Sequence, residues 1–468
     1  MGKNQASRPM AAEGKAWDEE ARGQAKLLKA FLGTVKHYFG GFERLFKGVS
    51  DPRQPLLITY PLAGLLFIGV LMFACHLGSR RQIKAKLGGN SRSAAKFGAL
   101  FGVERIPHGD SLNYGFKRLE PDQMQEAVCR MLEALIRKKV LSGWRLLAHY
   151  YLVAIDGTGM LTFGERHCAY CLTRKLNDGT TLYYHPVLEA KLVTANGFAF
   201  SMMTEFIENR DPQASKQDCE LKALYRLADR LKQRFPRLPI CLLLDGLFAG
   251  GPTLERCEGY DWKYLIVLTD DDLPTVNREF EALCHLAPDN QVQLELGKKQ
   301  EIEQAYRWMD EIAYLDAQGK EHQVSVLECL ETKSNDQGER QTTKFKWLTN
   351  FAPSVRTVSI LANEGGRLRW KIENEGFNAQ KKGGFELEHA YSQHETAAKV
   401  FYYLLQIAHI IFQLTEKGSL FRQAFPNGVG SLKNIAFRLL EAWRNLQLSP
   451  DGFLNLFKGR FQIRFDSS

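Results

Sequence analysis

Two aspartates, Asp156 and Asp245, each follow a short apolar stretch of the sequence and precede a glycine. We expect the two stretches, residues 150–155 and 240–244, to be buried strands of an α/β sheet. Binding residues cluster at the carboxyl ends of such strands, so both aspartates are candidates for holding metal ions. An aspartate after a strand is also a common turn former or helix cap, and for either residue alone this alternative stays open.

A third acid, Glu373, lies in a segment, residues 369–382, that we expect to be a helix. At about 100° per residue, Arg369 and Gln380 fall within about 40° of Glu373, whereas Glu375 lies about 200° away. Glu373 is therefore the predicted third acid, and Glu375 stays the alternative. An exposed ion pair on a helix surface would show the same spacing.

The sequence from Arg369 to Glu373, Arg-Trp-Lys-Ile-Glu, resembles the glutamate signature of bacterial insertion-sequence DDE transposases. It is similar to the branch with a Tyr-x2-Arg-x3-Glu-x6-Lys motif, whose core carries a β-strand insertion before the glutamate. The 89 residues from Asp156 to Asp245, and the 128 from there to Glu373, fit that layout. The resemblance covers residues 150–400 well and the preceding residues only loosely.

This chain departs from the motif at two positions. The motif tyrosine falls on Gly366, and the motif lysine falls on Gln380. Lys381 and Lys382, directly after it, are the remaining candidates for phosphate contacts from this segment, together with Arg369.

The resemblance implies a chemistry for the three acids. Asp156, Asp245 and Glu373 would be catalytic and would hold two Mg²⁺ ions, for which Mn²⁺ would substitute. Asp156 would bridge both ions, and the other two acids would each bind one. The implied reaction is hydrolysis and transesterification of DNA phosphodiesters, which makes the protein an endonuclease that also joins strands.

The resemblance also implies the architecture, an α/β protein with a ribonuclease H-like catalytic core. The expected segments are a helical, basic region that binds DNA ends (1–150), the first part of the core (151–270), a β-rich insertion (271–352), the second part of the core with the glutamate helix (353–415) and a helical C-terminal tail (416–468).

The implied function is that of an insertion-sequence transposase, which binds terminal inverted repeats and performs cut-and-paste transposition, with a DNA hairpin as one route. We expect double-stranded DNA as the partner, both element ends and target, and a homodimer in the DNA complex with contacts from the C-terminal tail. A metal-dependent nuclease of the same fold and a non-catalytic DNA-binding relic are the alternatives.

The charge of the chain agrees with a polyanionic partner. The formal net charge is +9, and residues 76–145 contain 14 basic residues against six acidic ones. Arg80, Arg81 and Lys84 lead this stretch and are candidate DNA contacts. A solvated basic face would have the same composition.

Trp347 lies in a Lys-Trp-Leu segment 26 residues before Glu373. Transposases of the resembled branch carry a similar segment, in which the tryptophan stacks on a flipped base, so Trp347 is a candidate DNA contact. Packing of the insertion against the core sheet is the alternative. On a strand, Lys344 and Lys346 would point to the opposite face from Trp347.

Nine cysteines, an odd number without a framework spacing, indicate a reducing compartment. One close pair, Cys168 and Cys171, follows His167. We expect this stretch to be a strand, in which residues three apart face opposite sides, and a second Cys-x2-Cys pair is absent from the sequence. The pair therefore does not predict a zinc site.

Two apolar runs span residues 62–75 and 397–414, and the first raises the alternative of a membrane-associated protein. The first run is 14 residues, roughly 21 Å as a helix, which is shorter than a bilayer core of about 30 Å. We expect both to be buried helices, the second packing behind the Glu373 helix. The N-terminal residues lack the apolar stretch of a signal peptide. We therefore expect a bacterial cytoplasmic protein, associated with the nucleoid and not with membrane.

Overall fold

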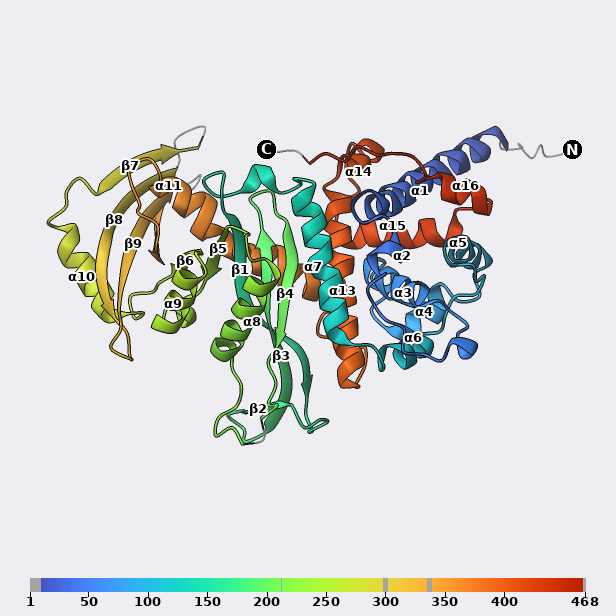
Figure 1. Ribbon diagram of the computed structural model, residues 1–468. Coiled ribbons are helices and arrows are strands. Elements are labelled where there is room, and N and C mark those ends of the chain that lie inside the picture. Colours follow the sequence, from blue (N-terminus) through green and yellow to red (C-terminus); the bar gives the residue numbers. More distant parts are fainter. Residues whose placement is uncertain (1–9, 212, 298–301, 335–338, 466–468) are drawn as a thin grey trace, which may run out of the picture. The chain divides into compact units, whose positions relative to one another are not determined.

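The computed structural model describes residues 10–211, 213–297, 302–334 and 339–465. The chain is a mixed α/β protein that divides into two compact units, whose elements are labelled in Figure 1. The helical unit combines the chain up to Lys138 with the chain from Ala379 onward, and the sheet unit comprises Lys139–Asn378. Residues 379–415, expected in the catalytic core, thus belong to the same compact unit as the N-terminal region.

The helical unit is built around two apolar helices, α3 (Leu62–Ala74) and α13 (Glu395–Glu416), which pack against each other. α13 also packs against α7 (Pro121–Arg137) and α1 (Met10–Phe39). The other described helices of this unit are α2 (Phe42–Leu45), η1 (Pro55–Leu57), α4 (Arg80–Lys86), α5 (Ser91–Phe101), α6 (Gly109–Phe116), α12 (Ala379–Lys382), α14 (Ser419–Ala424), α15 (Leu432–Asn445) and α16 (Pro450–Asn455).

The two apolar runs are interior helices. Among the described residues, α13 is the one helix long and apolar enough to cross a membrane, and its whole apolar window is buried inside the protein. α3 is buried along almost its whole length. The prediction of two buried helices is confirmed, and α1, α3 and α7 account for the apolar circumference of α13.

The sheet unit contains a ten-stranded mixed sheet with the order β2-β3-β1-β5-β6-β10-β9-β8-β7, and β4 also pairs with β3. The neighbours β1–β5 and β5–β6 are parallel, and the other pairs are antiparallel. The strands are β1 (Tyr151–Phe163), β2 (Leu172–Lys175), β3 (Thr181–Val193), β4 (Ala199–Phe206), β5 (Ile240–Leu244), β6 (Lys263–Val267), β7 (Gln291–Leu296), β8 (Ile302–Leu315), β9 (Glu321–Ser334) and β10 (Arg340–Thr349).

β1 is longer than its apolar stretch predicted. Its parallel pairing with β5 ends at Ala154, but antiparallel pairing with β3 continues to Phe163. Asp156 therefore lies within β1 rather than after it, and the expected strand end was wrong. The reason is that β3 supplies hydrogen-bond partners beyond the last apolar residue.

The segment expected to be a β-rich insertion, residues 271–352, contains β7, β8, β9 and β10, and β10 returns to the core by pairing with β6. Helix α10 (Pro274–Cys284) packs on β8, as Figure 1 shows. Further helices of the unit are η2 (Ser142–Trp144), α8 (Glu220–Arg234), η3 (Gly246–Phe248) and α9 (Gly251–Gly259).

The segment that carries Glu373 is helical but irregular. It consists of α11 (Val358–Ile360), the π-helical η4 (Leu361–Gly365), the 3-10 helical η5 (Gly366–Trp370) and the π-helical η6 (Ile372–Asn378). A regular α-helix over 369–382 was therefore wrong. Leu361, Ile372 and Phe377 of this segment join the core cluster that lies on the sheet.

Candidate active site

Asp156 lies within β1 and Asp245 directly follows β5, at matching positions in the register of the two strands. Ala154 of β1 pairs in parallel with Leu243 of β5, and each aspartate lies two residues beyond its member of that pair. Buried apolar strands position them, because β5 is buried throughout and β1 is buried up to Ile155. The sheet therefore places both aspartates at the same edge of the β1–β5 pair, although Asp156 does not end its strand as predicted.

Each aspartate is held by a backbone amide. The N–H of Gly157 donates to Asp156 Oδ1 at 2.9 Å, and the N–H of Leu247 donates to Asp245 Oδ1 at 3.1 Å. Asp245 thereby caps η3, and the same residue can cap this helix and belong to the candidate site.

Arg369 connects the irregular helical segment to these acids. Its Nη1 lies 3.3 Å from Asp156 Oδ2, while the side chain is largely buried and its guanidinium stacks over the ring of Trp370. Burial raises the pKa of Asp156, the charge of Arg369 opposes that rise, and the charges of Asp245 and Glu373 add to it. Three charged groups from two other stretches of the chain thus act on the carboxylate of Asp156.

The same interactions distinguish Glu373 from Glu375. Glu373 is solvent-exposed, and its charge acts on Asp156. Glu375 instead pairs with Lys371, whose Nζ lies 2.5 Å from its Oε1. The choice of Glu373 as the third acid stays a prediction, because η6 is π-helical and the 100° rotation used to predict it does not apply there.

A fourth acid, Glu220, lies at this site without having been predicted there. Burial raises the pKa of Glu220, and the charges of Asp156 and Asp245 raise it further. Its Oε1 occupies the space beside Gly157, only 2.0 Å from where a Cβ would stand. The sequence signal was present in Asp156-Gly157, because a missing side chain leaves room for a neighbour.

Asp272 likewise fills the space beside the glycine that follows Asp245. It accepts from the backbone N–H and the hydroxyl of Thr269, and its charge raises the pKa of Asp245 after the larger effect of burial. Its Oδ2 lies 2.3 Å from the place of a Cβ on Gly246. The nearby Glu205 and Asp218, in contrast, pair with Arg226, as expected for structural ion pairs.

Two glycines allow the helical segment to lie close to the sheet. A Cβ on Gly366 would be 2.3 Å from Nε1 of Trp347, and a Cβ on Gly376 would be 3.0 Å from Cδ of Lys191. Gly366 is the position where the resembled motif has tyrosine, and here Trp347 fills that space. Lys191 is fully buried and lies 3.6 Å from Glu189, so a buried ion pair underlies η6.

Trp347 is 2% exposed and belongs to the core cluster of the sheet unit. Its ring stacks on Phe345, and its indole N–H has no hydrogen-bond partner among the described residues. In this conformation the ring has no free face for a DNA base, which favours the packing alternative. Lys344 and Lys346 both pair with Asp270.

Lys381 and Lys382 lie in α12, within the helical unit. Lys381 pairs with Glu388 at 2.9 Å, and Lys382 is exposed. Gln380, at the position of the motif lysine, is buried and bonds to Gln406 and His409 of α13. An uncharged amide suits that position because it is packed inside the unit.

The basic helix α4 presents Arg81 and Lys84 to solvent, while Arg80 bonds to the carbonyl of Gly109 and pairs with Asp110. Lys96, counted in the same basic stretch, is 4% exposed. Its ammonium donates to the carbonyls of Trp443 and Leu446 at the end of α15. Lys96 therefore stabilises the helical unit and does not contribute to a basic surface.

Comparison with known proteins identifies no family for this chain. No protein-family model matches the chain, and no curated protein matches it.

Proposed function

We propose that this protein is a DDE transposase of an insertion sequence, with a ribonuclease H-like core that cuts and joins DNA at the element's ends. The observation that carries the proposal is the parallel register that places Asp156 and Asp245 side by side beyond the β1–β5 pairing, with Arg369 3.3 Å from Asp156. The sheet order β4-β3-β1-β5-β6, with β1 in the middle and the acids at the ends of its parallel contacts, supports the fold assignment.

The donor set suits hard divalent cations. Aspartate and glutamate oxygens are the ligands that Mg²⁺ prefers, and the negative charges of Asp245 and Glu373 both act on Asp156. Asp156, Asp245 and Glu373 would hold two Mg²⁺ ions, with Mn²⁺ as a substitute. Bound there, the ions would activate the attacking water or 3′-hydroxyl and stabilise the leaving oxygen.

The residues of the chain would contribute positioning and charge. Arg369 is a planar, permanently charged donor whose second edge can hold a phosphate oxygen while Nη1 remains near Asp156. Because its side chain is buried against Trp370, the guanidinium is already oriented before DNA binds. Arg81 and Lys84 would attract the duplex backbone through the exposed face of α4.

The direct test uses a plasmid that carries the DNA flanking the gene of this protein, including its inverted repeats. Asp156→Asn, Asp245→Asn and Glu373→Gln should each abolish Mg²⁺-dependent cleavage while binding to the repeat DNA is retained. Glu375→Gln is the matched control and should cleave normally, because Glu375 pairs with Lys371.

The outcome also separates the alternatives. Strand transfer together with cleavage supports a transposase, whereas nicking without joining would support a metal-dependent nuclease of the same fold. Activity that survives in Glu373→Gln but is lost in Glu375→Gln would overturn the assignment of the third acid. Specific DNA binding without cleavage in the unchanged protein would indicate a binding relic.

DNA binding by α4 can be tested separately. The double variant Arg81→Gln with Lys84→Gln should weaken binding to all duplexes and flatten the dependence of affinity on salt, because phosphate contacts release counterions. Unchanged affinity and salt dependence would show that another surface binds the DNA.

A further inference from the structure

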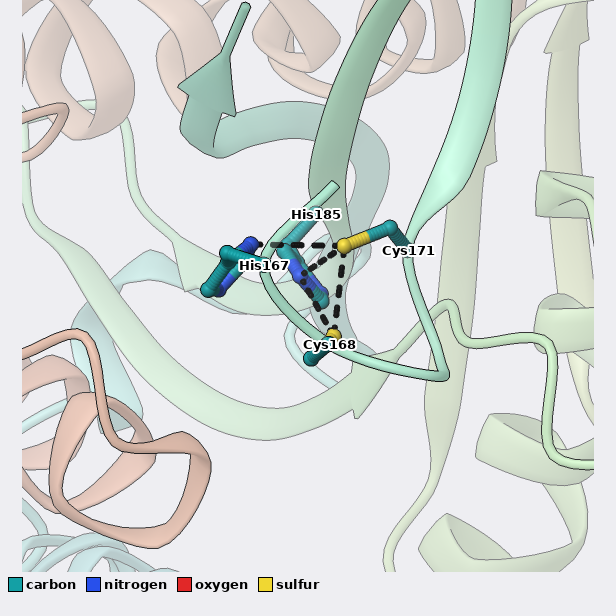
Figure 2. Close-up of side chains that lie close together, drawn as sticks. All are labelled: His167, Cys168, Cys171 and His185. Carbon is teal, nitrogen blue, oxygen red and sulfur yellow. Dashed lines mark hydrogen bonds between the residues drawn. The ribbon is translucent and has the colours of Figure 1, made fainter. Parts of the chain in front are cut away.

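Four side chains with metal-binding atoms converge beside the far end of β1. His167, Cys168 and Cys171 lie on the loop between β1 and β2, and His185 lies on β3 (Figure 2). The loop was expected to be a strand that would separate the two cysteines. Because it turns back instead, both sulfurs face the imidazole of His185.

Four of the six distances among the ligand atoms lie between 3.2 and 3.4 Å. Cys168 Sγ and Cys171 Sγ lie 3.2 Å apart, and each lies 3.3–3.4 Å from His185 Nε2. His167 Nδ1 lies 3.4 Å from Cys171 Sγ, and all four atoms fall within 4.8 Å of one another. Zinc–sulfur bonds of about 2.3 Å and zinc–nitrogen bonds of about 2.0–2.1 Å give tetrahedral ligand separations of about 3.4–3.8 Å.

The surroundings fix this arrangement. Cys171 is fully buried and His185 is 6% exposed, while His167 and Cys168 close the outer side. The side-chain amide of Asn209 donates to the carbonyl of Cys171 at 3.1 Å, which anchors the loop. Buried polar side chains need bonding partners to offset the loss of water. A single metal ion would be such a partner for all four side chains.

We propose that His167, Cys168, Cys171 and His185 bind one Zn²⁺ ion in a tetrahedral structural site. Two thiolates and two neutral imidazoles suit Zn²⁺ and do not suit Mg²⁺, and four protein ligands leave no open position for a substrate. On binding, each thiol releases its proton to solvent, so the Cys₂His₂ centre is electrically neutral. The ion would join the loop of residues 164–171 to β3.

The proposed zinc site is distinct from the acidic site. Asp156 and Phe163 are seven residues apart on β1, or about 23 Å for an extended strand, and the loop begins after Phe163. The proposal is therefore independent of the proposed function, and zinc occupancy can be measured without any DNA reaction.

The experiment measures metal content in the full-length protein, produced with zinc in the medium and purified under reducing conditions without chelator. About one zinc per chain is expected. Cys171→Ser and His185→Gln should each lose most of the metal and show a lower Tm. Cys219→Ser is the matched control, because Cys219 is an exposed cysteine outside the cluster, and it should retain the zinc of the unchanged protein.

Cobalt substitution provides a readout that does not depend on stability. The unchanged protein, loaded with Co²⁺, should show the visible absorption of tetrahedral cobalt with thiolate charge transfer, and His167→Gln should alter that spectrum. Octahedral cobalt, or failure of the reduced protein to take up either metal, would overturn the proposal. Equal metal retention in Cys171→Ser would indicate an adventitious ion only. If mass spectrometry instead finds a Cys168–Cys171 disulfide, as a loss of two hydrogens, in protein purified with reductant, the pair would be assigned to redox chemistry and the zinc proposal would fail.

Discussion

The guanidinium of Arg369 lies 3.3 Å from the carboxylate of Asp156, although the two residues are 213 positions apart in the sequence. This ion pair joins the irregular helical segment to β1 and brings a permanent positive charge among several carboxylates. Arg369 is 8% exposed, so its charge acts in an environment where water screens it poorly.

Replacement of Arg369 should separate charge from packing. Arg369→Lys keeps a cation and should retain part of the cleavage activity, whereas Arg369→Met should lose about 10²–10³-fold or more in kcat, as expected for a charge that stabilises phosphoryl transfer. Binding of repeat DNA should change much less. Single-turnover cleavage at saturating protein measures this difference, and equal activity of both variants would exclude a role for the charge.

Glu220→Gln should change the response to metal ions. The carboxylate of Glu220 is disfavoured by burial and by the charges of Asp156 and Asp245, so a neutral isostere should raise the Tm of the metal-free protein. The same change removes negative charge that attracts cations, and the Tm rise caused by Mg²⁺ should shrink. Differential scanning fluorimetry with EDTA or Mg²⁺ measures both effects. Asp229→Asn on the same helix is a control in which neither Tm shift should occur, because Asp229 pairs with Arg256 instead.

Trp347→Ala should destabilise the sheet unit by about 3–5 kcal/mol, because it opens a cavity in the core. Trp347→Phe should be far milder, since it keeps the ring packing and removes an indole N–H without a described partner. Denaturant unfolding measures both. If nicking and hairpin formation decline together with stability, the packing role holds. A selective loss of hairpin formation in a fully stable protein would restore the base-stacking role.

Lys96→Met should lower the stability of the helical unit, while Lys84→Met should leave it nearly unchanged. The ammonium of Lys96 bonds to two carbonyls at the end of α15, and charge-assisted hydrogen bonds contribute about 1.5–3 kcal/mol each. Lys84→Met should reduce the salt dependence of DNA binding more than Lys96→Met does, because Lys84 is exposed.

Burial also makes the contribution of Lys96 depend on pH. Desolvation lowers the pKa of Lys96 to about 8, below the value of the unfolded chain. The unfolded chain then binds more protons between about pH 8 and 10.5, so this residue's contribution to folding stability should rise with pH in that window. Urea unfolding of the unchanged protein and Lys96→Met at two pH values tests the sign. A difference between the two proteins that does not change across this window would contradict it.

The sequence by itself determined the elements with strong apolar patterns. The buried helix at 62–75, the buried strand at 240–244 and the placement of Asp156 and Asp245 beside buried strands could all be predicted. These features depend on local periodicity and on strand ends, which a single sequence records directly.

Tertiary structure decided the rest. Antiparallel pairing with β3 extends β1 past Asp156, and close packing on the sheet winds the segment of Glu373 into π and 3-10 turns. Trp347 is buried because Gly366 leaves space for it. His185 joins His167, Cys168 and Cys171 only through strand pairing, since the register of β3 against β1 sets where its imidazole lies. Contacts between residues distant in sequence leave no local pattern, so only the folded chain could reveal them.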